Sequence, residues 1–194
     1  MKEIIRVVVT GPTGSGKSSY IRNLSELELS ESKRDPECGT NLAHQETKLE
    51  FDFGRFNRNP EQVVHLYGIS GQTQFDFMRD LMIRRAHSYI LLLAADSPQE
   101  IKSGRAIIEF MQSRIQLPWI IGITRRDCPG AWRSKNIIMK LGLWQHPNCP
   151  TVVAINATER QSVTKSLNLL LRQLEPQSPA PVSYLNQVVT KFAG

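Results

Sequence analysis

The sequence lacks the features that define several classes of protein. Its three cysteines (Cys38, Cys128 and Cys149) lie far apart without paired spacing, which argues against a disulfide framework or zinc site and suits a reducing cytoplasm. No apolar run approaches the roughly 20 residues of a membrane-spanning helix, and the N-terminus has no secretion signal. Neither end carries a lipidation box. These absences predict a cytoplasmic protein with no integral membrane segment.

Charge of one sign is not concentrated in any segment. The chain has 24 Lys plus Arg against 18 Asp plus Glu, a formal net charge of +6, but its clusters of basic residues are only short pairs at 33–34, 84–85 and 125–126. Nucleic-acid-binding domains usually cluster basic residues among aromatic ones, so direct binding of nucleic acid is not expected. A length of 194 residues, with 40% hydrophobic and 22% charged, suits a folded domain that needs no disulfides.

Short apolar runs alternate with helical patterns along the chain. Strands are expected over residues 4–10, 49–53, 63–69, 89–94, 119–123 and 151–155, the last three covered on both faces. Amphipathic stripes predict helices over 101–115 and 163–174, the second preceded by a capping-box pattern at 158–161. Another helix is expected over 131–141. The alternation predicts an α/β fold, with a mainly parallel six-stranded sheet between helices on both faces.

Two stretches do not fit this alternation. Residues 26–46 are polar and without period, which predicts a long mobile loop, and residues 175–181 (EPQSPAP) read as a Pro-rich linker. Beyond the linker, residues 182–192 have the pattern of a short amphipathic segment. We therefore expect one domain over residues 1–175, followed by a linker and terminal segment over 176–194.

The strongest motif is GPTGSGKS at residues 11–18, which fits the phosphate-binding pattern G-x-x-x-x-G-K-[ST] between a strand and a helix. Its glycines let backbone N–H groups surround a phosphate, and the helix N-terminus adds its dipole. Lys17 can reach the β- and γ-phosphates, and the Ser18 hydroxyl lies where Mg²⁺ would bind. The predicted phosphate-binding residues are Gly11, Thr13, Gly14, Ser15, Gly16, Lys17, Ser18 and Ser19.

A second motif, GISGQ at residues 68–72, follows the third expected strand. The backbone N–H of Gly71 can meet a γ-phosphate, and Gln72 can orient the attacking water, as such a glutamine does in GTPases. The alternative is a plain strand-to-helix turn. With the phosphate loop upstream, we take Gly71 and Gln72 as candidate catalytic residues.

Two further segments are candidates for holding a purine base. In TRRD at residues 124–127, the Asp127 carboxylate can accept from the N1–H and 2-amino groups of guanine, a donor pair that adenine lacks. The stem of Arg125 can cover the base, and a backbone N–H near Ala157 can bind a purine carbonyl. The alternative is a solvated basic turn. The candidate base-binding residues are Thr124, Arg125, Asp127 and Ala157.

These motifs follow a fixed chain order at the carboxyl ends of strands, where ligands bind in open parallel sheets. With them in place, residues 4–174 resemble a small Ras-like GTPase with the P-loop NTPase fold. The resemblance is closest to bacterial small GTPases of the gliding-motility, polarity and conservon type, on the phrases Asp52-Phe53-Gly54 and Gly68-Ile69-Ser70-Gly71-Gln72. Residues 1–175 would then be a Ras-like GTP-binding domain.

The chain departs from the common Ras-like pattern at three places. Gly68 replaces the Asp that supports Mg²⁺, so metal support would come from Ser18, phosphates and water. The expected switch-one threonine position holds Lys48, with Thr47 beside it as the second candidate metal residue. Thr124 and Arg125 replace the common Asn and Lys, so guanine preference rests mainly on Asp127. No arginine finger is assignable among Arg34, Arg55 and Arg58.

The resemblance implies a switch that binds GTP or GDP with Mg²⁺, hydrolyses GTP slowly and recruits regulatory and effector proteins, among them an activating protein and an exchange factor. Two alternatives stay open: a non-hydrolysing scaffold on the same fold, and an ATP-using phosphoryl transferase. Asp127 disfavours the last. Outside the motifs, the sequence predicts packing roles for His65, Trp119, Trp132 and Trp144.

Overall fold

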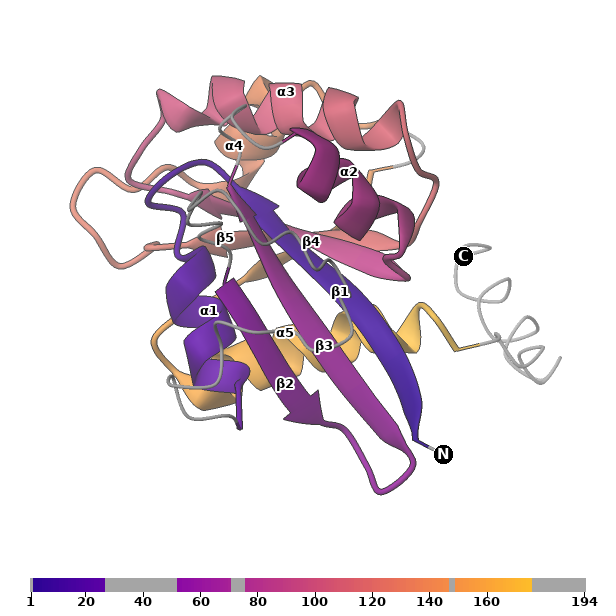
Figure 1. Cartoon of the computed structure of the whole chain (residues 1–194). Helices are drawn as coiled ribbons and strands as arrows, with labels where there is room; N and C mark the ends of the chain where they lie inside the picture. Colours follow the sequence, from indigo (N-terminus) through magenta and orange to yellow (C-terminus); the bar gives the residue numbers. More distant parts are fainter. Residues whose placement is uncertain (1, 27–51, 71–75, 147–148, 176–194) are drawn as a thin grey trace, which may run out of the picture.

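The computed structural model describes residues 2–26, 52–70, 76–146 and 149–175 (Figure 1). Several expectations lie outside these ranges. They include most of the polar stretch 26–46, the linker and terminal segment at 176–194, and the candidate site residues Thr47, Gly71 and Gln72.

The core of the molecule is a six-stranded sheet with the order β2-β3-β1-β4-β5-β6. Every neighbouring pair is parallel except β2 and β3, which form an antiparallel hairpin. The strands are β1 (Glu3–Gly11), β2 (Asp52–Asn57), β3 (Gln62–Ser70), β4 (Ser88–Ala94), β5 (Trp119–Thr124) and β6 (Thr151–Ala154). The predicted mainly parallel, six-stranded α/β fold is therefore confirmed.

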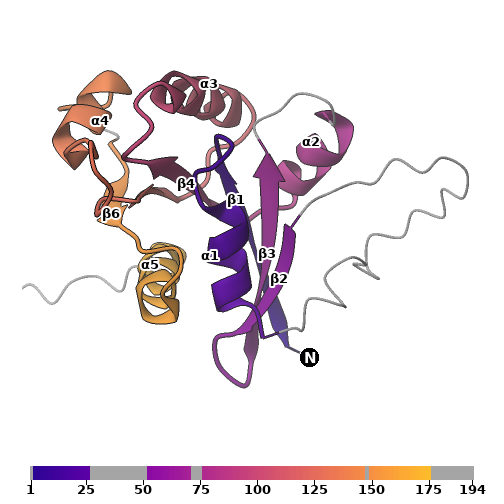
Figure 2. The same cartoon turned by 90° about the vertical axis from the view of Figure 1, so that its left-hand side faces the viewer.

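Helices cover both faces of the sheet (Figures 1 and 2). They are α1 (Lys17–Leu24), α2 (Asp76–Arg84), α3 (Glu100–Gln112), α4 (Ser134–Lys140) and α5 (Arg160–Arg172). Side chains of α1 and α5 share one core cluster with β1, β3 and β4. On the opposite face, α3 and α4 pack over β4 and β5, and α2 packs over β1 and β3. The result is a three-layer sandwich.

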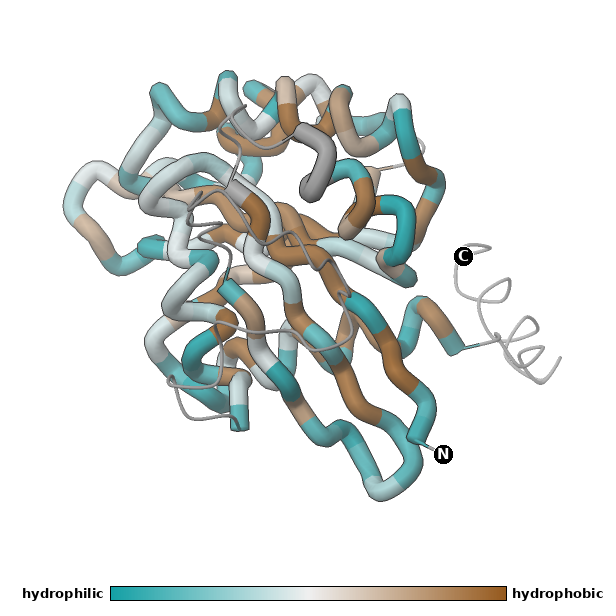
Figure 3. The backbone as a smooth tube through the Cα atoms, viewed as in Figure 1, coloured by the Kyte–Doolittle hydropathy of each residue, from teal (hydrophilic) through white to brown (hydrophobic). Residues whose placement is uncertain are grey.

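The central strands are buried because their side chains are apolar on both faces. All seven residues of β4 are buried, as its continuous apolar run predicts, and Figure 3 shows the apolar residues gathered along the inner strands. The same expectation is wrong for β6, whose residues are exposed or half-buried. β6 pairs only with β5 and forms an edge of the sheet, so one side of it has no neighbouring strand.

Two predicted element boundaries and one predicted helix cap are corrected. The second strand runs to Asn57 rather than Phe53, because the hairpin pairs Asn57 with Val63. The fourth helix begins at Ser134 rather than residue 131, since Gly130 takes a left-handed turn with φ of 77° before it. The capping box is absent: α5 follows Glu159 without a side-chain cap, and the Thr158 hydroxyl instead donates to Asn156 Oδ1.

Ile21 of helix α1 packs against two glycines of the β2–β3 hairpin. A Cβ atom added at Gly54 would lie 2.7 Å from Ile21 Cγ2, and one added at Gly68 would lie 2.7 Å from Ile21 Cδ1. Both distances are too short for real side chains, so the two glycines form a socket for Ile21. On the same helix, the buried Tyr20 hydroxyl lies 2.9 Å from Ser166 Oγ and joins α1 to α5. Because of these contacts, the start of α1 has a fixed position over the sheet.

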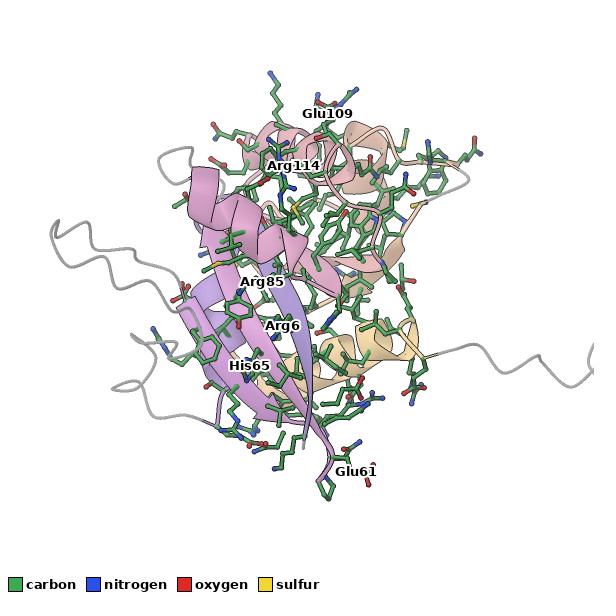
Figure 4. The ribbon with its side chains drawn as sticks, turned by 45° about the vertical axis from the view of Figure 1, so that its right-hand side comes forward. Arg6, Glu61, His65, Arg85, Glu109 and Arg114 are labelled. Atoms are coloured by element: carbon green, nitrogen blue, oxygen red, sulfur yellow. The ribbon has the colours of Figure 1, made fainter. Side chains whose placement is uncertain are left out.

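Part of the opposite sheet face carries polar side chains (Figure 4). Arg6 of β1 lies opposite His65 of β3, which is half-buried between the rings of Phe53 and Tyr67. This agrees with the packing role predicted for His65. None of the described helices is long and apolar enough to cross a membrane.

The packing role predicted for three tryptophans is confirmed only for Trp119, whose ring stacks on Tyr89 with centroids 5.1 Å apart. Trp132 and Trp144 are exposed instead. Both lie beyond the ends of α4, which is only seven residues long, so the helix does not cover their rings.

Candidate functional site

The predicted phosphate loop connects β1 to α1, so the strand–loop–helix context that its motif requires is present. Only glycine fits at two of its positions. Gly11 has φ of 153°, and a Cβ there would lie 2.3 Å from the Leu92 carbonyl oxygen. Gly16 is left-handed with φ of 96°, and a Cβ there would lie 3.2 Å from Ala157 Cβ. The loop is therefore held tightly against the ends of β4 and β6.

Lys17, the first residue of α1, turns back over the loop. Its Nζ donates to the carbonyl oxygens of Gly11, at 2.9 Å, and Pro12, at 2.8 Å. Burial lowers the pKa of this ammonium, and the nearby carboxylate of Asp52 partly opposes that effect. A buried cation with a lowered pKa gains from an added negative charge. The loop thus provides a site that favours a bound anion.

Asp52 is a further candidate site residue, which the sequence analysis did not single out. It is the first described residue of β2, and its Oδ2 accepts a hydrogen bond from the Ser18 hydroxyl at 2.7 Å. In the hairpin it lies directly opposite Gly68. A Cβ added at Gly68 would lie 2.9 Å from Asp52 Cβ and 3.3 Å from Asp52 Oδ2. The Asp52 carboxylate therefore takes up the space that a side chain at position 68 would need.

The position of Asp52 beside Ser18 changes the expectation for which residues would hold Mg²⁺. A nucleotide-bound Mg²⁺ usually takes one or two protein oxygens together with phosphate oxygens and water. Ser18 and Asp52 supply one hydroxyl and one carboxylate at the N-terminus of α1, so these residues fit such an ion. The described part of the chain holds no cluster of three or more His, Cys, Asp or Glu side chains that could hold a metal ion. Metal support thus need not rest on Ser18, phosphates and water alone.

Thr124 contacts the phosphate loop. Its side chain is buried, and its hydroxyl lies 2.9 Å from the Ser15 carbonyl oxygen and 3.4 Å from that of Leu93. Both are acceptors, so the hydroxyl donates its proton inside the protein. Thr124 is therefore a positioning residue that joins the carboxyl end of β5 to the loop.

The remaining candidate base residues lie around the same strand ends. Arg125 has a left-handed backbone with φ of 53°, and its guanidinium lies 3.3 Å from Asp96 Oδ2 in a half-exposed ion pair. Asp127 is exposed. Ala157 is buried, and its carbonyl oxygen accepts from Asn23 Nδ2 at 3.0 Å, which fixes the β6–α5 loop to α1. The structure thus brings both base segments to the edge where the phosphate loop lies.

The remaining phosphate-binding candidates and the arginines considered as fingers lie in different places. Thr13 is exposed, and the Ser19 carbonyl oxygen accepts from Asn23 Nδ2 within α1. Of the arginines considered as fingers, Arg58 follows β2 and forms an ion pair with Glu175 after α5, and Arg55 lies within β2. Arg34, like Thr47, Gly71 and Gln72, lies outside the described residues.

Comparison with solved structures agrees with the fold described above. No protein-family model matches the chain. Over 126 residues it is 25% identical to the uncharacterized protein MJ1339 of Methanocaldococcus jannaschii, a match that covers 65% of this chain and 73% of that one. The structure of the present chain is similar to that of the Arl6 (BBS3) small GTPase from Trypanosoma brucei with the bound nucleotide analogue GppNp. The TM-score is 0.68 at 14% identity, over 90% of this chain and 99% of the other.

Proposed function

We propose that this chain, which has the fold of small GTPases, is a switch protein that binds GTP and GDP and hydrolyses GTP slowly. The observation that carries the proposal is the group formed by Lys17, Ser18 and Asp52 at the N-terminus of α1. It combines a buried ammonium with a hydroxyl–carboxylate pair beside a loop in which only glycine fits at two positions. A phosphate chain and its metal ion need this combination of charges.

The phosphate end of the site binds and orients the nucleotide. Backbone N–H groups of residues 13–18 and the dipole of α1 favour the β-phosphate, and Lys17 pairs with the β- and γ-phosphates. Ser18 and Asp52 are the residues that would hold Mg²⁺, Ser18 through its hydroxyl and Asp52 through its carboxylate. Thr47 remains a further candidate. When bound, Mg²⁺ neutralises charge on the β- and γ-phosphate oxygens.

The base end gives guanine selectivity in this proposal. Asp127 accepts from the N1–H and 2-amino groups of guanine, and the stem of Arg125 covers the base. A backbone N–H beside Ala157 binds the purine carbonyl. Thr124 acts through the phosphate loop, since its hydroxyl donates to loop and strand carbonyls.

We expect slow turnover because the sequence assigns no arginine finger, a group that contributes about 10³–10⁵ in rate, and Arg58 is paired with Glu175. Gly71 donates to the γ-phosphate, and Gln72 orients the attacking water. An activating protein would then control hydrolysis, an exchange factor could control GDP release, and effectors would bind the GTP state. Within small GTPases we assign the chain to the bacterial gliding-motility, polarity and conservon type, acting in the cytoplasm.

The proposal is tested by calorimetry on the nucleotide-free protein. Titration with GDP, GTP and ATP, each with Mg²⁺ and with EDTA, should give tight guanine-nucleotide binding and little binding of ATP. Affinity should fall in EDTA, because Ser18 and Asp52 then have no ion to hold. A preference for ATP would point instead to phosphoryl transfer with ATP.

A second candidate function is a non-hydrolysing scaffold on the same fold. The observation that favours it is Gly68, where Ras-like chains carry their metal-supporting carboxylate. Single-turnover hydrolysis of GTP by the wild-type protein and Gln72→Ala separates the two. The switch requires the variant to be slower while it still binds GTP. No hydrolysis by the wild type, with or without an activating partner, would favour the scaffold. Equal non-zero rates in the two proteins would exclude the role of Gln72.

A further inference from the structure

Among the described residues, the exposed large hydrophobic side chains gather in one short segment. They are Trp132, Met139 and Trp144, which are 36%, 52% and 45% exposed. All three lie on α4 or within a few residues of its ends. We refer to Trp132, Met139 and Trp144, with the basic residues between them, as the tryptophan patch. Packing in the core does not account for these three side chains, whereas it does account for Trp119.

The patch has a defined outer surface because α4 uses its other face for packing. Ile137 and Ile138 are buried in the core cluster beneath α3 and α4, together with Leu141 and Leu143. Lys135 and Met139 are four residues apart, so they lie on one side of the helix. Lys135 Nζ lies 4.8 Å from the centre of the Trp144 ring, which brings the turn after α4 back onto this side. Lys135, Met139 and Trp144 of the patch therefore lie on one side of α4 and the turn that follows it.

Trp132 is fixed to the rest of the molecule through its backbone. Its N–H donates to the carbonyl oxygen of Ala95 at 2.8 Å, and Ala95 N–H donates to the Thr124 carbonyl oxygen at 2.9 Å. The ring is thus presented from a rigid position at the carboxyl ends of β4 and β5. In Figure 2, α4 lies at the side of the molecule away from β2, so contacts made there leave Asp52 uncovered.

The charge of the patch has one sign. Arg133, Lys135 and Lys140 are exposed, and residues 128–146 contain no aspartate or glutamate. Like-charged residues that repel one another in the free protein gain most from a surface of opposite charge. The partner that this segment fits is therefore anionic and also able to accept indole rings.

We propose that the tryptophan patch docks the protein on an anionic lipid surface. Indole rings favour the headgroup level of a bilayer, where their apolar bodies leave water and the N–H stays hydrated. Lysine and arginine beside them are attracted by anionic headgroups. A protein interface usually has a polar rim with groups able to pair on both sides. Here the exposed polar residues Asn136 and Gln145 are uncharged, and every charged group of the patch is a cation beside an apolar side chain. This association with lipid goes beyond nucleotide binding and needs no lipid anchor.

The test uses the full chain and sedimentation with vesicles. Binding is measured to phosphatidylcholine vesicles with and without about a third phosphatidylserine. We expect binding only to the anionic vesicles, with affinity falling as salt is added. Changing both Lys135→Gln and Lys140→Gln should weaken binding roughly 30-fold, from the contribution of two cations near an anionic surface. The matched control, Lys2→Gln with Lys165→Gln, removes the same charge from exposed positions outside the patch and should bind as the wild type does.

A second measurement tests insertion of the rings. Phosphatidylcholine brominated on its acyl chains, mixed into the anionic vesicles, should quench tryptophan fluorescence of the wild type, and Trp144→Gln should remove a large part of that quenching. Circular dichroism checks that each variant is folded. No binding to anionic vesicles would overturn the proposal, as would equal losses in the patch and control variants. Patch-dependent binding to polyglutamate without vesicle binding would overturn it in favour of an acidic protein partner.

Discussion

The two ends of the candidate nucleotide site are built differently. At the phosphate end, Lys17 has two carbonyl partners, Ser18 is paired with Asp52, and glycine alone fits at positions 11 and 16. At the base end, Asp127 is exposed, and Arg125 is held by a half-exposed ion pair with Asp96. The phosphate end is therefore preformed by the fold, whereas the base end presents side chains that a ligand would still have to order.

The difference follows from what each end has to recognise. A phosphate is bound by backbone N–H groups, whose positions are set by strand, loop and helix geometry. A base is recognised by a few side chains at strand ends, and these gain their partners only when the ligand arrives. We infer that affinity comes mainly from the phosphate end and that selectivity between purines comes from the base end.

The largest effect is expected at Lys17. Lys17→Ala removes the ammonium that pairs with the phosphates, and losing two charge-assisted hydrogen bonds should weaken GDP and GTP binding about 1,000-fold. Calorimetry measures the loss, with Lys165→Ala on α5 as the control for removing an exposed lysine. Unchanged GDP affinity in Lys17→Ala would break the comparison, because the preformed end would then contribute little.

Asp127 should change selectivity rather than overall affinity for phosphates. Asp127→Asn replaces an acceptor pair with one acceptor and one donor, so the 2-amino group of guanine loses its partner. We expect guanine-nucleotide binding to weaken about 100-fold, because an unpaired polar group is left in the contact. Xanthosine diphosphate, which has a carbonyl at position 2, should bind the variant better than GDP does. A GDP affinity equal to that of the wild type would place base recognition elsewhere.

Asp52 should affect only the metal-dependent part of binding. In Asp52→Asn, the amide oxygen can still accept from Ser18, but the charge that favours a cation is gone. Affinity for GDP with Mg²⁺ should fall about 10- to 100-fold, while affinity in EDTA should stay the same or rise, because the negative charge near Lys17 is removed. An equal loss in Mg²⁺ and in EDTA would show a structural effect instead.

Positions 52 and 68 can be tested as a pair. Gly68→Asp places a side chain against Asp52 and Ile21, and overpacking of this kind should lower the free energy of unfolding by about 2 kcal/mol. Adding Asp52→Gly removes the contacts with Asp52 but leaves the one with Ile21, so the double variant should recover part of the lost stability and keep Mg²⁺-dependent binding. Urea unfolding measures the first effect and calorimetry the second. Additive losses in the double variant would contradict a shared space.

The smallest effect is expected behind the phosphate loop, at Tyr20. Burial raises the pKa of this hydroxyl, which stays protonated and bonds to Ser166 and Val163 of α5. Tyr20→Phe removes the hydrogen bonds but keeps the ring, so unfolding should cost about 1 kcal/mol less, measured in urea. Nucleotide affinity should be unchanged, which separates support of α1 from binding.

The sequence predicted most of the fold, because its strands are continuous apolar runs and its phosphate loop has a strict pattern. It also predicted that the two candidate base segments follow the ends of strands, and β5 and β6 do end at Thr124 and Ala154. It did not identify Asp52, since the contact with Ser18 depends on the hairpin register that sets Asp52 opposite Gly68. It proposed Thr124 for the base but did not predict that its hydroxyl donates to the carbonyl oxygens of Ser15 and Leu93, because hydrogen-bond direction cannot be inferred from sequence spacing. Trp132 and Trp144 were missed as surface residues because hydrophobic type alone does not distinguish core from patch.

The contact of Ile21 with Gly54 and Gly68 has a consequence for evolution. Three segments distant in the chain share one small volume, in which a branched side chain from α1 and the Asp52 carboxylate leave no room for a Cβ at position 68. The substitutions accepted at these sites should therefore depend on one another. Descendants of a common ancestor that carry aspartate at the position of Gly68 should have lost the one at Asp52 and reduced the residue at Ile21. Intermediates with both carboxylates should be rare.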